Sequence, residues 1–271
     1  MASPRRVRAA SERIRERPAD RDFMAGLAKG LSVIACFDDH HARLTIADIA
    51  AMTGLSRAAA RRCLLTLCQL GYATFDGKFF CLTPRILKLG YAYLSSSELP
   101  QLVQPFLEHL SDQIHESCSA SILDSDAIVY IARSAKKRIM SVDLAVGSRL
   151  PAYCTSMGRV LLAALPPAEA RSRLQGSDLR RATAWTCTRL DDLMVLITQV
   201  RQQGYCVIDQ ELEPGLVSLA VPLLNSAGQT VAAINTSAQS ARIAAADMPT
   251  RFLAKLLETQ ANLRPLVKSA L

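Results

Sequence analysis

An arginine-rich segment with helical character is the first part of the chain that suggests a chemistry. It runs from Arg57 to Leu70, and Ser56 before it has the side chain of a helix N-cap. At 100° per residue, three arginines and a small residue share one arc of about 140°. These residues are Arg57, Ala58, Arg61 and Arg62. Arginine contacts phosphate and pairs bidentately with guanine, and a small neighbour lets a helix backbone approach groove edges. This face therefore predicts contact with nucleic acid, and a solvated arginine face is the ordinary alternative.

The segments before it supply the rest of a helix-turn-helix. Residues 23–37 have apolar side chains at helical spacing, which predicts a first helix. A short helix is expected over residues 46–52, with Thr45 as its N-cap and Asp48 completing a capping box. Gly54 then ends this short helix. A short helix, a tight turn and a longer helix is the order typical of a helix-turn-helix.

The segment after the arginine helix predicts a wing. Two short strands, residues 72–74 and 79–82, are joined by Asp76-Gly77, a strong signal for a hairpin turn. A winged helix-turn-helix is therefore expected over residues 23–84. Its candidate DNA contacts are Thr45, Ser56, Arg57, Ala58, Arg61, Arg62 and Lys78.

The excess of positive charge is concentrated in the first third of the chain. Residues 1–97 contain fifteen Lys and Arg against eight Asp and Glu, whereas the remainder contains seventeen against sixteen. Residues 1–22, with seven arginines and no apolar period, are expected to be a disordered basic arm. An inert basic tail would explain part of this excess, but the arrangement is typical of a domain that binds a polyanion.

The cysteines do not indicate a metal site. The eight cysteines form no C-x-x-C pair, and the four histidines are not near them at zinc-ligand spacing. We expect no metal, no cofactor and mostly free, packed thiols in a reducing compartment. Residues 1–22 lack the apolar core of a signal peptide or anchor, and the most apolar stretch, residues 160–165, is too short to span a bilayer. A cytoplasmic location without membrane association is the expectation.

The remaining residues predict a linker and a second domain. Residues 85–98 have an apolar stripe and end in serines, which predicts a linker helix that could pack against a second subunit. Pro100 and Pro105 then open a domain over residues 99–271, in which hairpins alternate with helices. Helices gathered on one side of antiparallel strands would make this domain α+β. The expected strands are 119–123, 128–133, 139–142, 219–224 and 230–237, and the expected helices are 106–115, 155–165, 190–203 and 249–263.

These segments resemble the IclR family of bacterial regulators over essentially the whole chain after the arm. The helix-turn-helix reads TIADIAAMTGLSRAAARRCLLTLCQLGYA. In the second domain the likeness lies in GSRLPAYCTSMGRVLLAAL (147–165) and GYCVIDQELEPGLVSLAVPL (204–223). The stretches RDFMAGLAKGLSVIACF and RLPAYCTSMGRVLLA resemble the PcaR, PcaU and PobR type, a branch that controls aromatic-acid catabolism through the β-ketoadipate pathway.

The resemblance implies a GAF-like effector domain, a homodimer or dimer of dimers, a palindromic operator and a small carboxylate effector. It is also compatible with contact with RNA polymerase. Carried over by position, the family's pocket residues correspond to Ser156, Met157, Ile208, Ser218, Asn235 and Ser237. Some members have Gly and Ala where this chain has Ser156 and Met157, which argues against the family's smallest ligands.

The residues themselves agree with a carboxylate site. The free N–H groups at the start of a helix capped by Thr155 would hold a carboxylate, and Met157, Ile139 and Tyr153 would supply apolar walls for a ring. For Ser156 the alternative is helix capping alone. Arg133 and Arg149 are candidates for pairing with the ligand's charge, although ordinary ion pairs are the commoner role.

An enzyme is not expected. Cys154 lies near a helix start but has no histidine near it in sequence, so no catalytic residue is proposed. The sequence thus predicts a regulator that binds operator DNA and senses an aromatic acid or a β-ketoadipate-pathway metabolite. The alternatives are another small oxo-acid or a cysteine redox switch.

Overall fold

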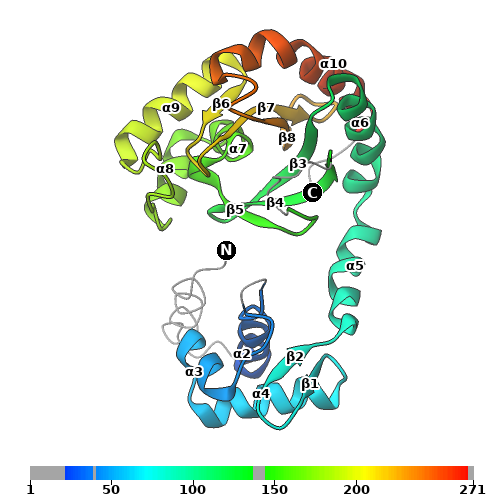
Figure 1. Cartoon of the computed structure of the whole chain (residues 1–271), viewed down its shortest axis with the longest axis vertical. Helices are drawn as coiled ribbons and strands as arrows, with labels where there is room; N and C mark the ends of the chain where they lie inside the picture. The colour runs from blue at the N-terminus through cyan, green and yellow to red at the C-terminus, as the bar shows by residue number, and fades with distance from the viewer. Residues whose placement is uncertain (1–21, 39–40, 137–143, 268–271) are drawn as a thin grey trace. The chain divides into compact units, whose positions relative to one another are not determined.

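The chain divides into two units that meet in the sequence between Tyr93 and Leu94. The computed structural model describes residues 22–38, 41–136 and 144–267, and Figure 1 labels its helices and strands. The basic arm expected over residues 1–22 lies outside this description except for Asp22. The strand expected over residues 139–142 lies outside it entirely.

The first unit has the winged helix-turn-helix that the sequence predicts. Its helices are α2 (Ala25–Ile34), α3 (Ile46–Thr53) and α4 (Arg57–Gln69), followed by the hairpin of β1 (Ala73–Phe75) and β2 (Phe80–Leu82). The Thr45 Oγ1 accepts from the Asp48 N–H at 3.2 Å while Asp48 Oδ2 accepts from the Thr45 N–H at 2.8 Å. This capping box is the predicted one, and Gly54, with φ of 71°, ends α3 in the left-handed conformation that glycine favours.

Helix α4 buries one face and exposes the arginine face. Ala60, Leu64 and Leu67 are buried in the core of the first unit, together with Ile49 and Phe80. Leu70, at the end of this helix, is 53% exposed although it is apolar. It is the C-cap residue, so the chain already leaves the helical path there.

The expected linker helix is shorter than predicted. A 3-10 turn (Pro84–Ile86) precedes α5 (Leu87–Ser96), and Ser97 is extended before the next helix begins. That helix, α6 (Glu98–Ile114), starts well before the predicted residue 106. Pro100 lies in its first turn, where a missing N–H costs nothing, and buried apolar residues at helical spacing carry the helix past Pro105.

Six antiparallel strands form the sheet of the second unit, in the order β5-β4-β3-β8-β7-β6. The two central hairpins are the predicted ones, and each strand is slightly longer than expected. The strands are β3 (Ser117–Asp124), β4 (Ala127–Ser134), β5 (Arg149–Pro151), β6 (Cys206–Asp209), β7 (Leu216–Leu224) and β8 (Thr230–Gln239).

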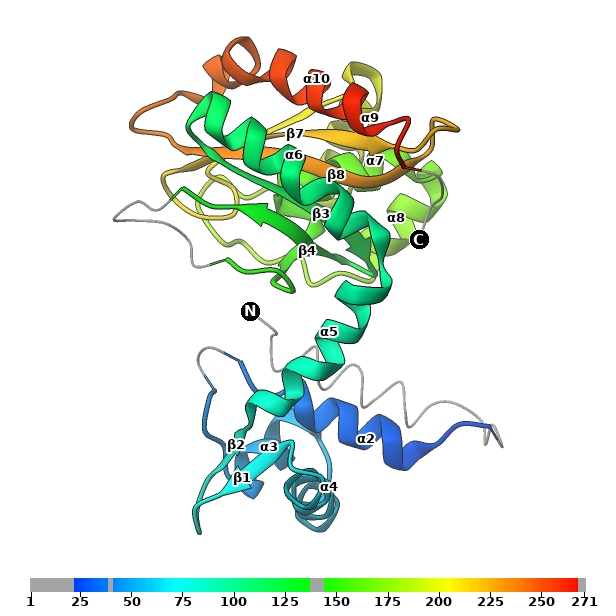
Figure 2. The ribbon, with the colours of Figure 1, turned by 90° about the vertical axis from the view of Figure 1, so that its right-hand side faces the viewer.

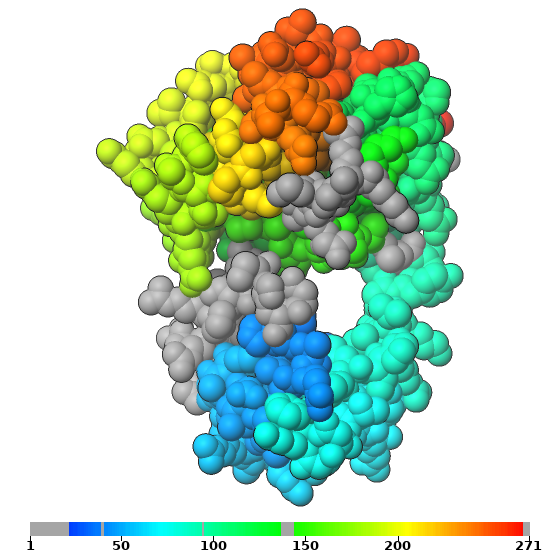
Figure 3. All heavy atoms as spheres, in the orientation of Figure 1, coloured from blue at the N-terminus to red at the C-terminus, as the bar shows by residue number. Residues whose placement is uncertain are grey.

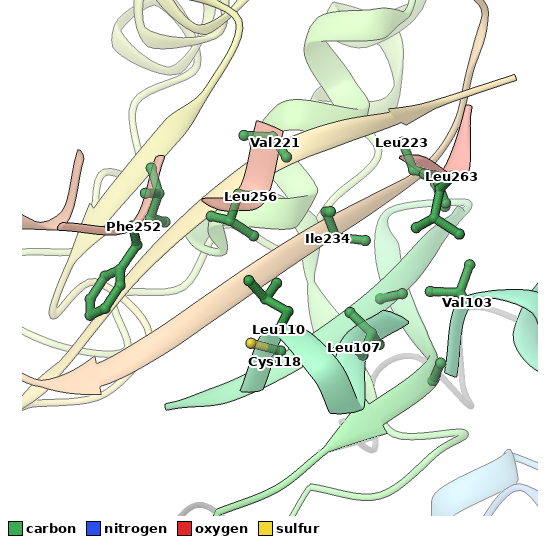
Figure 4. Packing of buried hydrophobic residues seen from close by; sticks show 14 of the residues in the cluster. Val103, Leu107, Leu110, Cys118, Val221, Leu223, Ile234, Phe252, Leu256 and Leu263 are labelled. Carbon is green, nitrogen blue, oxygen red and sulfur yellow. The ribbon is translucent and has the colours of Figure 1, made fainter. Parts of the chain in front are cut away.

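Helices cover both faces of this sheet, which corrects the expectation that they gather on one side. Helices α6 and α10 (Ala254–Leu263) lie side by side on one face (Figure 2). Their leucines pack on Val221 and Ile234 of the strands (Figure 4). Helices α7 (Ser156–Ala164) and α9 (Leu190–Gln203) pack with a second apolar cluster on the opposite face. The α+β class is confirmed, and the GAF-like arrangement stays a prediction.

Two short elements were not foreseen. The strand β5 has three residues, too few for a periodic signal. Helix α8 (Pro167–Gln175) begins directly at a proline, which is favoured in a first helical turn. Helices α8 and α9 contact each other, and Figure 3 shows both exposed on the surface.

Gly158 allows α7 to begin against the preceding turn. A Cβ on Gly158 would lie 2.2 Å from the Ala152 carbonyl oxygen and 2.5 Å from Thr155 Oγ1. Backbone atoms cannot give way as a flexible side chain can, so only glycine fits here.

We expect Gly158→Ala to lower the free energy of unfolding by about 3 kcal/mol, because the added methyl overlaps the Ala152 backbone. Denaturant unfolding of the whole chain measures this. Gly176→Ala is the matched control: its added Cβ would meet nothing nearer than 3.6 Å, so stability should change little. Equal effects of the two substitutions would contradict the close approach.

Candidate functional site

A groove in the first unit brings together most of the residues that the sequence selected for DNA contact. Three segments line it: the start of α3, the first turns of α4 and the wing. The lining residues are Thr45, Ile46, Ala47, Arg57, Ala58, Arg61, Phe75, Gly77 and Lys78. Three of them are cationic and none is acidic. Arg62 and Ser56 are exposed beside the groove rather than lining it.

The hydroxyls of Thr45 and Ser56 serve as helix caps. Ser56 Oγ accepts from the Ala59 N–H at 3.2 Å, as Thr45 Oγ1 does from Asp48. The arginines are different, since neither Arg57, Arg61 nor Arg62 has an ion pair within the described residues. Their charge is therefore available to an external anion.

The wing is held by Asp76 and ends in a cation. Asp76 Oδ1 accepts from the N–H groups of Lys78 at 2.9 Å and Phe79 at 2.7 Å, and its other oxygen pairs with Arg43. These backbone hydrogen bonds, with the Arg43 charge, lower the pKa of Asp76. The Lys78 Nζ lies 5.1 Å from the centroid of the Phe79 ring, which supports the side chain beside the groove.

A cavity of about 570 Å³ lies in the second unit, between the sheet and the start of α7. It is large enough for a small organic ligand. One wall is apolar and includes Met157, Leu144 and Leu212, while the opposite wall is the polar surface of the sheet.

The register of the strands explains why the sheet wall is polar. Ser119 on β3 faces Arg133 on β4 and Asn235 on β8. Residues that face each other across antiparallel strands have their side chains on the same side of the sheet, so these three form one row. A neighbouring row consists of Ser117, Ser237, Ser218 and Ile208.

The N-terminus of α7 faces this polar wall. Thr155 is the N-cap, and its Oγ1 accepts from the Gly158 N–H at 3.2 Å. Ser156 is therefore not the cap, and its Oγ is buried without a hydrogen-bond partner among the described residues. The N–H groups of Ser156 and Met157 belong to the first turn, where no intrahelical acceptor exists. This end of α7 thus offers donors to an anion.

Two further atoms of the lining residues are buried without a partner. They are Asn235 Oδ1 and Arg133 Nε. All three atoms line one cavity, where a polar ligand or water can supply the missing hydrogen bonds.

Six of the eight ligand residues selected from the sequence line the cavity. They are Ser156, Met157, Ile208, Ser218, Asn235 and Ser237. Tyr153 is not among the lining residues, and its hydroxyl donates to the Arg180 carbonyl at 2.5 Å. Ile139 lies outside the described residues.

Sequence reasoning missed Tyr130 as a lining residue, and it named Arg133 as a candidate for pairing with the ligand's charge, with an ordinary ion pair as the commoner role. Tyr130 is 5% exposed, and burial raises its pKa to about 12, so the phenol stays neutral. Arg133 forms no ion pair within the described part of the chain, whereas Arg149 pairs with Asp124 away from the cavity.

A buried ion pair connects α7 with the loop that closes the cavity. Arg159 Nη2 donates to Glu211 Oε2 at 2.6 Å, and its Nε donates to the Tyr153 carbonyl at 2.9 Å. The same Glu211 oxygen accepts from the Cys187 N–H at 2.9 Å. Because Leu212 to Leu216 line the cavity, this pair positions one of its walls.

Three of the four cysteines of the second unit are buried thiols. Burial raises the pKa of Cys154, Cys206 and Cys118 to about 12. A thiol reacts as its thiolate, so these three groups are unreactive toward electrophiles near neutral pH. Within the described residues, no group of three or more His, Cys, Asp or Glu side chains is placed to hold a metal ion.

Comparison with known proteins identifies the two units. A model of the IclR helix-turn-helix domain matches residues 26–77, and a model of the bacterial transcriptional regulator IclR C-terminal domain matches residues 91–263. The chain belongs to the IclR family. It is therefore a member of a family of transcriptional regulators, not of enzymes.

Relatives within the IclR family control aromatic catabolism. The chain is 48% identical over 262 residues to the Pca regulon regulatory protein of Pseudomonas putida, covering 96% of this chain and 90% of that protein. It is 38% identical to the p-hydroxybenzoate hydroxylase transcriptional activator of Acinetobacter baylyi, over 91% of this chain and 93% of that protein. The resemblance to this branch is confirmed.

A solved IclR-type structure matches the second unit. It is the inducer-binding domain of a double mutant of PobR from Acinetobacter, in complex with 3-hydroxybenzoic acid. The TM-score is 0.60 and the sequence identity 34%, over 63% of this chain and all of that one. Among the described residues of the present chain, no helix combines the length and apolarity needed to cross a membrane.

We expect iodoacetamide at pH 7.5 to modify Cys154 and Cys206 roughly tenfold or more slowly in the native protein than in guanidinium chloride. Burial and the raised pKa both keep the thiolate scarce. Peptide mass spectrometry of samples taken over time measures the rates. Similar rates in the two conditions would show accessible thiolates and would revive the redox alternative.

Proposed function

We propose that this IclR regulator binds operator DNA in the cytoplasm and responds to an aromatic acid or a β-ketoadipate-pathway metabolite. The observation that carries the proposal is the buried Ser156 hydroxyl at the start of α7, which has no partner among the described residues and faces the polar wall of the cavity. The relatives support the ligand class: one is named for the Pca regulon, and a double mutant of the PobR inducer-binding domain forms a complex with 3-hydroxybenzoic acid.

In this proposal α4 is the recognition helix. Its first turns present Arg57 and Arg61 to the major groove, while Ala58 between them leaves room for the base edges. Lys78 on the wing takes a neighbouring phosphate. A dimer would place two such helices about one helical turn of DNA apart.

The effector's carboxylate would lie at the N-terminus of α7. The N–H groups of Ser156 and Met157 and the Ser156 hydroxyl would donate to its oxygens. Met157 and Ile208 would contact the ring or carbon chain, and Ser218, Asn235 and Ser237 would contact its polar substituents. This arrangement uses all six lining residues selected from the sequence.

Exposed apolar residues support self-association as a homodimer or dimer of dimers. Met24, Leu27 and Leu31 form an exposed stripe on α2. Helix α5 exposes Leu87 and Tyr91 on one side and Leu89 and Tyr93 on another. A helix that is apolar on several sides is normally enclosed by protein, and a second copy would enclose it. Contact of the bound dimer with RNA polymerase would connect DNA binding to transcription.

Substitution Arg61→Ala should weaken binding to the operator about tenfold, because one base or phosphate contact is lost. Fluorescence anisotropy at fixed salt measures this with a duplex selected from random DNA by the wild-type protein. Arg85→Ala serves as the control, since Arg85 lies over the Tyr72 ring, outside the groove. Unchanged affinity of Arg61→Ala would refute the recognition helix.

An effector at 100 times its dissociation constant should raise the free energy of unfolding by about 2.7 kcal/mol. Thermal unfolding of the whole chain with protocatechuate, 4-hydroxybenzoate and β-ketoadipate tests this. Ser156→Ala should weaken the acid that binds about tenfold while leaving the ligand-free melting temperature nearly unchanged, because Thr155 caps the helix. If no acid shifts the melting temperature, the assignment of this effector class fails.

A further inference from the structure

Arg133 is held firmly while part of its guanidinium remains without a partner. Its backbone N–H donates to Gln104 Oε1 at 3.1 Å, and Gln104 Nε2 donates to its carbonyl at 3.2 Å. Its Nη1 donates to Ser119 Oγ at 3.0 Å. The Nε takes part in none of these hydrogen bonds and is buried without an acceptor among the described residues.

The other charged groups of the cavity wall are neutralised or exposed. Glu116 pairs with Arg242, and Lys136 pairs with Asp112 at 2.6 Å. Glu213 is exposed to solvent, where its charge is screened. Arg133 therefore contributes a cation that no carboxylate of the described residues balances. The guanidinium is partly buried, and an anionic or acceptor group of a ligand could accept from its Nε and balance its charge.

Arg133 and Asn235 occupy different places along the polar wall of the cavity. Arg133 lies on β4, and Asn235 in the same row lies two strands away on β8. Two strand spacings separate their backbones by on the order of 10 Å. The cavity thus has hydrogen-bond donors for a ligand's oxygen atoms in two places, one at the start of α7 and one at Arg133. An apolar wall lies beside them.

We propose that the effector is a bifunctional acid, with a carboxylate at the N-terminus of α7 and a second oxygen acceptor at Arg133. This inference rests on the proposed function and specifies the ligand further. The second group is a carboxylate in a ring-opened diacid or a phenolic oxygen in a hydroxybenzoate. Acids that lack this second carboxylate or phenolic oxygen leave Arg133 without an ion-pair or hydrogen-bond partner from the ligand and bind weakly.

Two matched pairs of acids test the proposal on the whole chain. β-Ketoadipate is compared with levulinate, which keeps the keto group and one carboxylate, and 4-hydroxybenzoate is compared with benzoate. The fluorescence of Trp185, the single tryptophan, reports binding. The residues beside it, Thr183 and Thr186, donate to carbonyls of the loop next to the cavity, those of Gln210 and Glu211. Melting temperature gives a second readout.

In the wild-type protein, at least one bifunctional acid should bind about tenfold or more tightly than its counterpart. Arg133→Met should reduce that preference to less than about threefold while leaving the affinity for the counterpart unchanged. Arg133→Lys should retain part of the preference. Arg149→Met, which removes an exposed arginine outside the cavity, should retain all of it.

Three results would overturn the inference. Levulinate and benzoate could bind as tightly as their bifunctional partners, which would leave no second contact. Arg133→Met could weaken both members of a pair equally, which would place the single carboxylate at Arg133. If none of the four acids binds the wild-type protein, the proposed function fails together with this inference. The ligand-free melting temperature of Arg133→Met shows that the variant is folded.

Discussion

Antiparallel pairing places residues that face each other across strands on one side of the sheet, and the cavity depends on this constraint. Ser119 and Asn235 occupy central strands, where apolar side chains would normally fill a core. Their register gathers them with Arg133 into one polar surface. The opposite face of the same strands carries Val221 and Ile234 and packs beneath α6 and α10 (Figure 4). One face is apolar beneath its helices, while the other combines a second apolar cluster with the polar residues that line the cavity.

Helix α7 joins the polar surface to the rest of the second unit. Its first turn is fixed by the Thr155 cap, the close approach at Gly158 and the Arg159–Glu211 ion pair. A buried ion pair contributes little net stability, because desolvation of both charges offsets their attraction. Its value here is geometric, since it sets the loop before β7 against the helix. Similarly, Gln104 ties Arg133 to α6, the element that follows the linker helix in the chain.

Signals between residues a few positions apart predicted the elements of the first unit. In the second unit, the features that depend on contacts between distant residues could not be predicted in this way. The Thr45 capping box, Gly54 and the Asp76-Gly77 turn act within a few residues, so the sequence alone indicates the winged helix-turn-helix. The side of the sheet that each helix covers depends on distant contacts, and that expectation was wrong. The orphaned Nε of Arg133 was equally invisible, because it requires knowing which carboxylates pair elsewhere. The pocket residues came from resemblance rather than from pattern.

The cavity also bears on the lifetime of the protein. A ligand that binds the folded chain and not the unfolded one stabilises the fold, so local opening is easier when effector is scarce. Proteases degrade chains in proportion to such opening when reclosing is fast. The metabolite would thus control how much regulator persists in the cell as well as how it binds. Turnover would then follow nutrient supply without any separate degradation signal.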